Sequence, residues 1–216
     1  DVIREFALDT EASAAAEHRA YEALLSQLGV PVRRDLPGVG SNLRDHLSVR
    51  LVAKAKGTRT MNEMSRAPRL WAQIARWMTK QPSILALSPS LVHWFWQSRA
   101  GLDRPDLQGV FSPASYREGY VGMLDTYPGM TCGVWQHRPK SCGTVQAQSA
   151  DPFAAPVIRP NYLSDPDDRQ VLVDGVRIAR NLLRTNALSR FVETESLPGV
   201  AVQRDDELLD FVRRFG

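Results

Sequence analysis

Residues 36–46 hold the densest set of groups that could do chemistry in this sequence. The segment reads LPGVGSNLRDH, in which Asn42, Asp45 and His46 closely follow one proline and two glycines. Proline fixes φ and glycine permits positive φ, so we predict an irregular loop that can approach another surface closely. Two interpretations stay open from the residues alone. The three polar side chains either satisfy local backbone groups, or they bind a ligand against the loop.

No other residues suggest a catalytic or metal-binding arrangement. The sequence shows no Ser-His-Asp pattern and no paired carboxylates of the kind that hydrolases use. No cysteine or histidine has a second ligand at the spacing of a zinc site. The four histidines are His18, His46, His93 and His137, and none has a visible acidic or nucleophilic partner. We therefore assign no catalytic residue and no metal ligand from the sequence.

The two cysteines, Cys132 and Cys142, flank a segment that is predicted to turn. If residues 129–137 and 143–149 pair as a hairpin around residues 138–141, the position opposite Cys132 lies near Ser149. The thiols are then several residues out of register and beyond disulfide reach. We expect two free thiols, which suits a reducing compartment.

Composition and charge narrow the classes of function. A chain of 216 residues with 43% hydrophobic residues can bury a sizeable core, and we predict one main domain. The net charge is +3, with cations dispersed among acids, which argues against a nucleic-acid partner. No stretch approaches the roughly 20 apolar residues of a membrane span, and the acidic first residues do not resemble a signal peptide. The sequence predicts a soluble, cytoplasmic protein.

The apolar pattern predicts an α+β fold. Strand-like alternation dominates the middle of the chain, and its hairpin-like pairs favour an antiparallel sheet. Helical spacing with good caps follows, with Ser164 before the first turn and Pro166 in it. Helices predicted at 66–80 and 165–185 cover the sheet. The sheet is predicted to have about five or six strands, from residues 47–56, 90–98, 105–116, 129–137 and 143–149. Further helices are predicted ahead of Gly29 and over 205–214.

Residues 90–98 are the most aromatic segment of the chain. As a strand, the segment places His93 and Phe95 on one face and Trp94 and Trp96 on the other. The rings either pack in a core or form the wall of a substrate cavity that excludes water. Both interpretations stay open here.

The order of several motifs over residues 20 to 215 resembles the glucose-methanol-choline (GMC) oxidoreductases, flavoenzymes that oxidise alcohols. The 36–46 segment matches the form LPGVGxNLxDH, which leads from the flavin domain into the substrate domain in that family. The resemblance implies FAD as cofactor, with Asn42, Asp45 and His46 near it. It also implies that the aromatic strand, through Trp94 and Trp96, borders the substrate. The later motifs are Arg104-Pro105-Asp106, His137-Arg138-Pro139-Lys140-Ser141, Asp151-Pro152, Pro160-Asn161-Tyr162-Leu163-Ser164-Asp165-Pro166 and Asp205-Asp206-Glu207-Leu208.

The sequence departs from the family pattern in ways that bear on activity. The resemblance implies that Val110 also borders the substrate, at the position where choline-oxidising relatives carry an active-site histidine. A valine cannot donate a hydrogen bond to an alkoxide. No acid lies between Lys80 and Arg99, where choline-type relatives carry one, which argues against a quaternary ammonium substrate. The Gly-rich FAD cradle and the His-Pro-x-Gly turn with the catalytic histidine are not in the sequence.

Two functions follow from the resemblance. In the first, residues 31–216 are the substrate-binding domain of an FAD-dependent alcohol oxidoreductase, preceded by a divergent helical segment at 1–30. That domain binds a small alcohol, is not catalytically competent alone, and needs an FAD-binding domain or a complementary chain. In the second, the domain is a stand-alone, non-enzymatic binding module. Separation from its partner would expose apolar surface, so we also expect self-association.

Overall fold

The computed structural model describes residue 19 and residues 21–88, 90–120 and 122–216. The chain divides into two compact units, a smaller one of Asp1–Asp45 with Pro139–Asp168 and a larger one of His46–Arg138 with Arg169–Gly216. The helix predicted ahead of Gly29 is seen over residues 21–27, and its earlier part lies outside the described residues. Gly29 has a φ of 71°, so it ends the helix as predicted.

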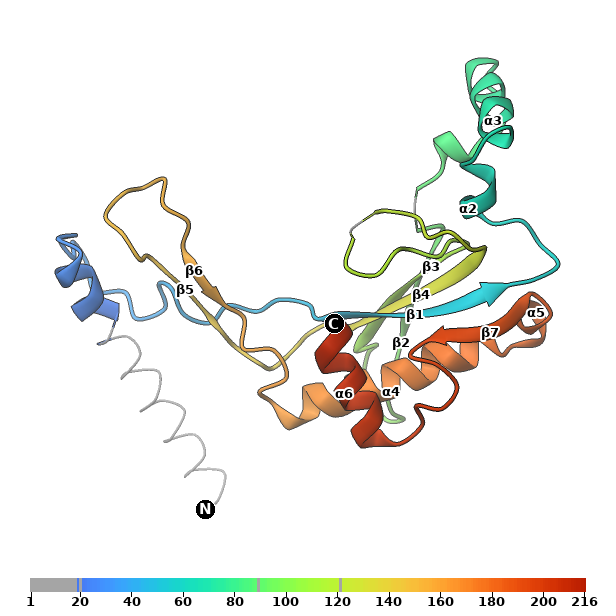
Figure 1. Cartoon of the computed structure of the whole chain (residues 1–216). Helices are drawn as coiled ribbons and strands as arrows, with labels where there is room; N and C mark the ends of the chain where they lie inside the picture. The colour runs from blue at the N-terminus through green and yellow to red at the C-terminus, as the bar shows by residue number, and fades with distance from the viewer. Residues whose placement is uncertain (1–18, 20, 89, 121) are drawn as a thin grey trace. The chain divides into compact units, whose positions relative to one another are not determined.

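The larger unit is built on a five-stranded antiparallel sheet (Figure 1). The strands are β1 (Ser48–Ala55), β2 (Val92–Trp96), β3 (Leu107–Ser112), β4 (Gly129–Gln136) and β7 (Val192–Leu197). Their order across the sheet is β2-β3-β4-β1-β7, and every neighbouring pair is antiparallel. The predicted α+β fold, its antiparallel sheet and four of its strands are confirmed.

The predicted hairpin of 129–137 with 143–149 is wrong. β4 pairs with β1 and β3, whereas β5 (Thr144–Gln146) pairs with β6 (Val157–Arg159) in a separate two-stranded sheet of the smaller unit. The expected turn is held open by Asp168, whose carboxylate accepts from the backbone N–H groups of Lys140 and Ser141 at 2.7 to 3.1 Å. β7, which the sequence analysis did not predict, is the fifth strand of the main sheet.

The two free thiols are confirmed, although Cys132 and Cys142 do not lie in the two arms of one hairpin. Cys132 lies buried in β4 of the larger unit, and Cys142 lies in the smaller unit.

Two helices cover one face of the five-stranded sheet (Figure 1). α4 (Pro166–Leu183) packs at Gly175, where an added Cβ would lie 3.0 Å from Leu107 and 3.1 Å from Val134. α6 (Asp205–Phe215) contacts β1. Both helices match the predicted ranges. Their apolar stripes form the core with the sheet, through residues such as Leu51, Val134, Val176, Leu208 and Val212, all fully buried.

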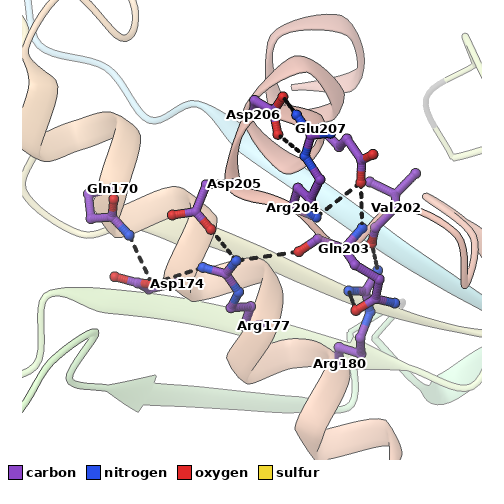
Figure 2. A network of polar contacts seen from close by, with 10 residues as sticks. All are labelled: Gln170, Asp174, Arg177, Arg180, Val202, Gln203, Arg204, Asp205, Asp206 and Glu207. Carbon is purple, nitrogen blue, oxygen red and sulfur yellow. Dashed lines mark hydrogen bonds and ion pairs between the residues drawn. The ribbon is translucent and has the colours of Figure 1, made fainter.

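Polar side chains join α4 to the segment that leads into α6 (Figure 2). Arg177 contacts the carboxylate of Asp205 and lies within 3.4 Å of the Gln203 carbonyl oxygen. Arg180 donates to the Val202 carbonyl oxygen at 3.0 Å. It also donates to both carboxylate oxygens of Glu195 in β7, which the figure does not draw. These contacts fix α4 against the edge strand.

The remaining helices of the larger unit are short. They are α2 (Met61–Met64), α3 (Arg69–Met78), the 3-10 turn η1 (Ile84–Ala86) and α5 (Asn186–Ser189). The helix predicted at 66–80 is confirmed as α3, which begins at Arg69. Among the described residues, no helix has the length and apolar character needed to cross a membrane.

Candidate functional site

The face of the main sheet opposite α4 and α6 is the candidate site. Residues that pair directly across an antiparallel sheet point to the same face. Arg50 pairs with Gly133, Gly133 with Val110, and Val110 with His93. We call the surface that contains this row the open face. It also includes Ser48, Phe95, Gln108 and Trp135, which pair in the next row.

One end of the open face carries an aromatic cluster of His46, Phe95, Gln108, Trp135 and His137. His137 Nδ1 lies 3.1 Å from Gln108 Oε1, and the Phe95 ring meets the His137 ring edge-on, with 5.7 Å between centroids. The His46 ring lies 6.2 Å from the rings of both Trp135 and His137. The cluster combines an apolar surface with imidazole and amide groups.

One hydrogen bond fixes the orientation of the His46 imidazole ring. His46 Nε2 lies 3.1 Å from the backbone carbonyl oxygen of His137. A carbonyl oxygen only accepts, so Nε2 carries the hydrogen and donates. The contact therefore sets both the orientation of the ring and the position of one proton.

The middle of the open face is apolar. The Val110 side chain leans toward Gly133, where an added Cβ would lie 3.0 Å from the Val110 Cγ2 atom. His93, the strand partner of Val110, is exposed. This part of the face offers methyl groups beside an imidazole, and Val110 supplies no hydrogen-bond donor.

A pocket of about 470 Å³ lies on the β1 side of the open face. Its lining includes Arg50, three tyrosines (Tyr116, Tyr120 and Tyr127) and Ser196. The Arg50 guanidinium lies 5.9 Å from the centre of the Tyr116 ring, within the range of a cation–π contact. Arginine and hydroxyl groups suit a polar ligand, so this end of the face differs in chemistry from the aromatic cluster.

The three residues predicted to bind substrate do not share one face. Val110 lies on the open face, whereas Trp94 pairs with Gly109 and Trp96 with Leu107 on the face that packs toward α4. The Trp94 indole covers Gly109 so closely that an added Cβ would lie 2.1 Å from Trp94 Cζ2. Successive residues of a strand point to opposite faces, so Val110 and the two tryptophans face away from one another. Their role in substrate binding remains a prediction.

The predicted loop at 36–46 is irregular, as expected. Gly40 has a φ of 80°, and an added Cβ would lie 2.9 Å from the Val145 carbonyl oxygen, which shows the close approach that glycine permits. Asn42 has a φ of 59°. Asp45 accepts a hydrogen bond from the Tyr162 hydroxyl, and this bond raises the pKa of Tyr162 to about 12.

Asn42 and Asp45 belong to the smaller unit and His46 to the larger unit. Their cofactor-binding role remains a prediction.

Gln108, Trp135 and His137 were not predicted from the sequence to be members of one site. Alternation within the strands was visible and places Trp135 and His137 on one face. The register that brings Gln108 beside them is a property of the folded sheet.

The family model described as GMC oxidoreductase matches residues 139–215. An alcohol dehydrogenase [acceptor] from Pseudomonas putida is 32% identical over 192 residues, which are 88% of this chain and 35% of that protein. An oxygen-dependent choline dehydrogenase from Klebsiella pneumoniae is 35% identical over 195 residues, 88% of this chain and 34% of that protein. The chain is related to the GMC oxidoreductases. It spans about a third of the length of these curated relatives.

Solved structures share the fold. A formate oxidase superposes with a TM-score of 0.77 at 21% identity, covering 89% of this chain and 38% of that one. A pyridoxine 4-oxidase from Mesorbium loti gives 0.69 at 19%, covering 89% and 34%. The alignments to the two curated relatives cover 88% of this chain, so they include most of the residues of the open face.

Proposed function

We propose that this chain is the substrate-binding part of an FAD-dependent alcohol oxidoreductase, and that the open face forms one wall of the active site. The observation that carries the proposal is that the face left uncovered by α4 and α6 presents the aromatic cluster beside Val110. The substrate-binding part corresponds to residues 31–216. Its partners are a small alcohol and an FAD-binding region, in the same chain or a complementary one.

The open face suits the organic part of a small, uncharged alcohol. Flavin, when bound, accepts a hydride from the carbinol carbon while a base removes the hydroxyl proton. In this chain Phe95 and Trp135 would pack on the alkyl part and exclude water. Val110 would contact carbon rather than oxygen, since it has no donor. His46 holds one proton at Nε2 through the His137 carbonyl oxygen.

The described residues hold at most part of a flavin site. The resemblance puts Asn42 and Asp45 near the flavin, whereas the close approach at Gly40 is made to Val145 and Tyr21 of this chain. The part of the chain that the structure describes has no parallel sheet with a Gly-rich turn into a helix, which is the usual pyrophosphate cradle. We therefore propose that this chain does not oxidise alcohols by itself.

Alcohol binding tests the role of the open face. Chemical-shift changes in the chain would be followed by NMR during titration with a series of small alcohols. We expect Phe95→Ala and Val110→Ala to weaken binding about threefold to tenfold, since each removes buried apolar contact. Val92→Ala is the matched control, because Val92 is exposed and lies on the opposite face, and it should leave the affinity unchanged. Equal effects of all three variants, or an effect of Val92→Ala alone, would contradict the proposal.

Flavin binding is a separate test. The visible spectrum of flavin and the quenching of tryptophan fluorescence would be recorded before and after FAD is added to the purified chain. Weak binding that Asn42→Ala and Asp45→Ala abolish would support a flavin-facing loop. Alcohol binding without any flavin effect would favour the stand-alone binding module.

A further inference from the structure

Helix α3 exposes its apolar side and buries part of its polar side. At 100° per residue, the side chains of Trp71, Ile74, Trp77 and Met78 fall on one half of the helix and Gln73 on the other. Gln73 is only 7% exposed, whereas Trp71, Trp77 and Met78 are 67%, 56% and 73% exposed. A helix on a globular domain normally shows the reverse arrangement.

Specific contacts hold α3 in this orientation. The side-chain oxygen of Gln73 accepts from the backbone N–H of Ile84 at 3.1 Å, and the Ser83 hydroxyl donates to the Gln73 carbonyl oxygen at 2.9 Å. Arg76 Nε donates to the Pro82 carbonyl oxygen at 2.7 Å. The polar half of the helix is thereby bonded to residues 82–84, which keeps the apolar half directed outward.

The apolar side of α3 belongs to a larger exposed segment of unusual charge. Residues 64–102 contain five cations and no acid, whereas the rest of the chain has 22 cations against 24 acids, the totals being 27 and 24. In Figure 1, α3 stands clear of the sheet. The exposed large apolar side chains of this segment are Trp71, Trp77, Met78, Leu85, Leu87, Leu91, Val92, Phe95 and Trp96.

We propose that α3 docks this protein on the surface of an anionic lipid bilayer. Tryptophan favours the boundary between headgroups and acyl chains, and arginine or lysine favours the phosphate layer. Each cation near an anionic leaflet adds electrostatic attraction. Trp71, Trp77 and Met78 would enter the boundary, while Arg69 and Lys80, at the two ends of the helix, would meet lipid phosphates.

A second copy of the chain is a poorer occupant for the same surface. Two copies that met through α3 and its flanks, residues 66–80, would bring four cations of one against four of the other, with no acid within this range on either side. A leaflet with anionic headgroups provides the complementary charge.

Vesicle co-sedimentation of the whole chain tests the proposal. The vesicles would contain phosphatidylcholine alone or mixed with phosphatidylglycerol, and tryptophan emission would report burial of the rings. We expect binding to the mixed vesicles, weakened by salt, and a loss of about tenfold or more in partition for the double variant Trp71→Ala, Trp77→Ala. Both positions are exposed in a helix, so alanine should preserve the fold.

Matched controls distinguish binding through α3 from non-specific hydrophobic or electrostatic binding to vesicles. Phe153→Ala removes an exposed aromatic ring of the smaller unit and should leave partition unchanged. The pair Arg69→Gln, Lys80→Gln should weaken binding to mixed vesicles, whereas Arg213→Gln on α6 should not. Three results would overturn the proposal. The first is that the unaltered chain does not bind vesicles, and the second is that Phe153→Ala reduces partition as much as the tryptophan double variant does. The third is that the unaltered chain forms a dimer in solution that is lost in the double variant Trp71→Ala, Trp77→Ala.

Discussion

Burial is the main influence on the chemistry of Cys132. Its side chain lies within β4 on the face covered by α4, with no exposed surface. Burial raises the pKa of this thiol from 9.0 to about 12, and the nearby Trp94 side chain opposes the rise only in part. A thiol that keeps its proton is a poor nucleophile, so Cys132 is a structural residue.

The raised pKa of Cys132 makes stability depend on pH. Above about pH 9 the thiol loses its proton in the unfolded state but keeps it in the folded state. Deprotonation therefore favours the unfolded state, and the free energy of unfolding falls as the pH rises from about 9 toward 12. We expect a loss of about 1.4 kcal/mol in the free energy of unfolding by about pH 10. Urea unfolding of the unaltered chain and of Cys132→Ala, at about pH 8 and about pH 10, measures it.

Cys132→Ala should lose less stability than the unaltered chain over this interval, and Cys142→Ala should behave like the unaltered chain. The same loss in Cys132→Ala and in the unaltered chain would exclude the thiol as the cause.

Asn62 is a second residue whose burial has a clear energetic meaning. It is buried in α2, donates to the Ser115 and Asp125 carbonyl oxygens at 2.8 and 3.2 Å, and accepts from the Ser115 N–H at 2.9 Å. Asn62→Ala leaves these groups without their partner, so we expect a loss of about 2–4 kcal/mol in the free energy of unfolding. Urea unfolding measures it, with exposed Asn186→Ala as control. Equal changes in both variants would contradict this role.

At the scale of elements, one buried ion pair joins α4 to β7. The Arg180 guanidinium donates to both carboxylate oxygens of Glu195 at 2.7 and 2.8 Å, and both side chains are almost fully buried. Replacing one partner leaves a buried charge uncompensated. We expect Arg180→Met to lower the free energy of unfolding by about 3–5 kcal/mol, measured by urea or thermal unfolding.

A neighbouring pair provides the control for Arg180. Arg177 and Asp205 form an ion pair between α4 and α6 at the surface (Figure 2), and Arg177→Gln should cost less than about 1 kcal/mol. The double variant Arg180→Met, Glu195→Leu should recover stability relative to Arg180→Met alone. If Arg177→Gln and Arg180→Met lowered the free energy of unfolding by similar amounts, burial of the Arg180–Glu195 pair would not explain the effect.

At the scale of the whole molecule, the open face predicts association. It presents Phe95 and the aromatic cluster without a covering element among the described residues. We expect concentration-dependent self-association in sedimentation experiments, reduced by Phe95→Ser, because exposed apolar surface favours contact between copies. Val200→Ser, at an exposed apolar position outside this face, should have no effect. A monomer at all concentrations would contradict the prediction.

This association is distinct from docking through α3. The double variant Trp71→Ala, Trp77→Ala should leave self-association through the open face unchanged, whereas Phe95→Ser should leave partition to vesicles largely intact.

The sequence by itself determined the elements whose signals are local. The alternation in β1 and β4, the apolar stripe and caps of α4, and the acidic start of α6 all arise within a few consecutive residues, and each element lies where the pattern predicts it. The order of motifs determined the relation to GMC oxidoreductases. The turn chemistry of residues 36–46 predicted the close backbone approach at Gly40.

Only the tertiary structure decided which residues share a surface. The His46 ring meets a carbonyl oxygen 91 residues away, and Asn62 bonds to residues 53 and 63 positions away. In the folded sheet, Val110 and Trp94 lie on opposite faces. The strand pairing places β7 beside β1 and pairs β5 with β6 instead of β4. Contacts to residues 82–84 turned the apolar side of α3 outward. Such pairings depend on the mutual fit of distant segments, and no local propensity contains that information.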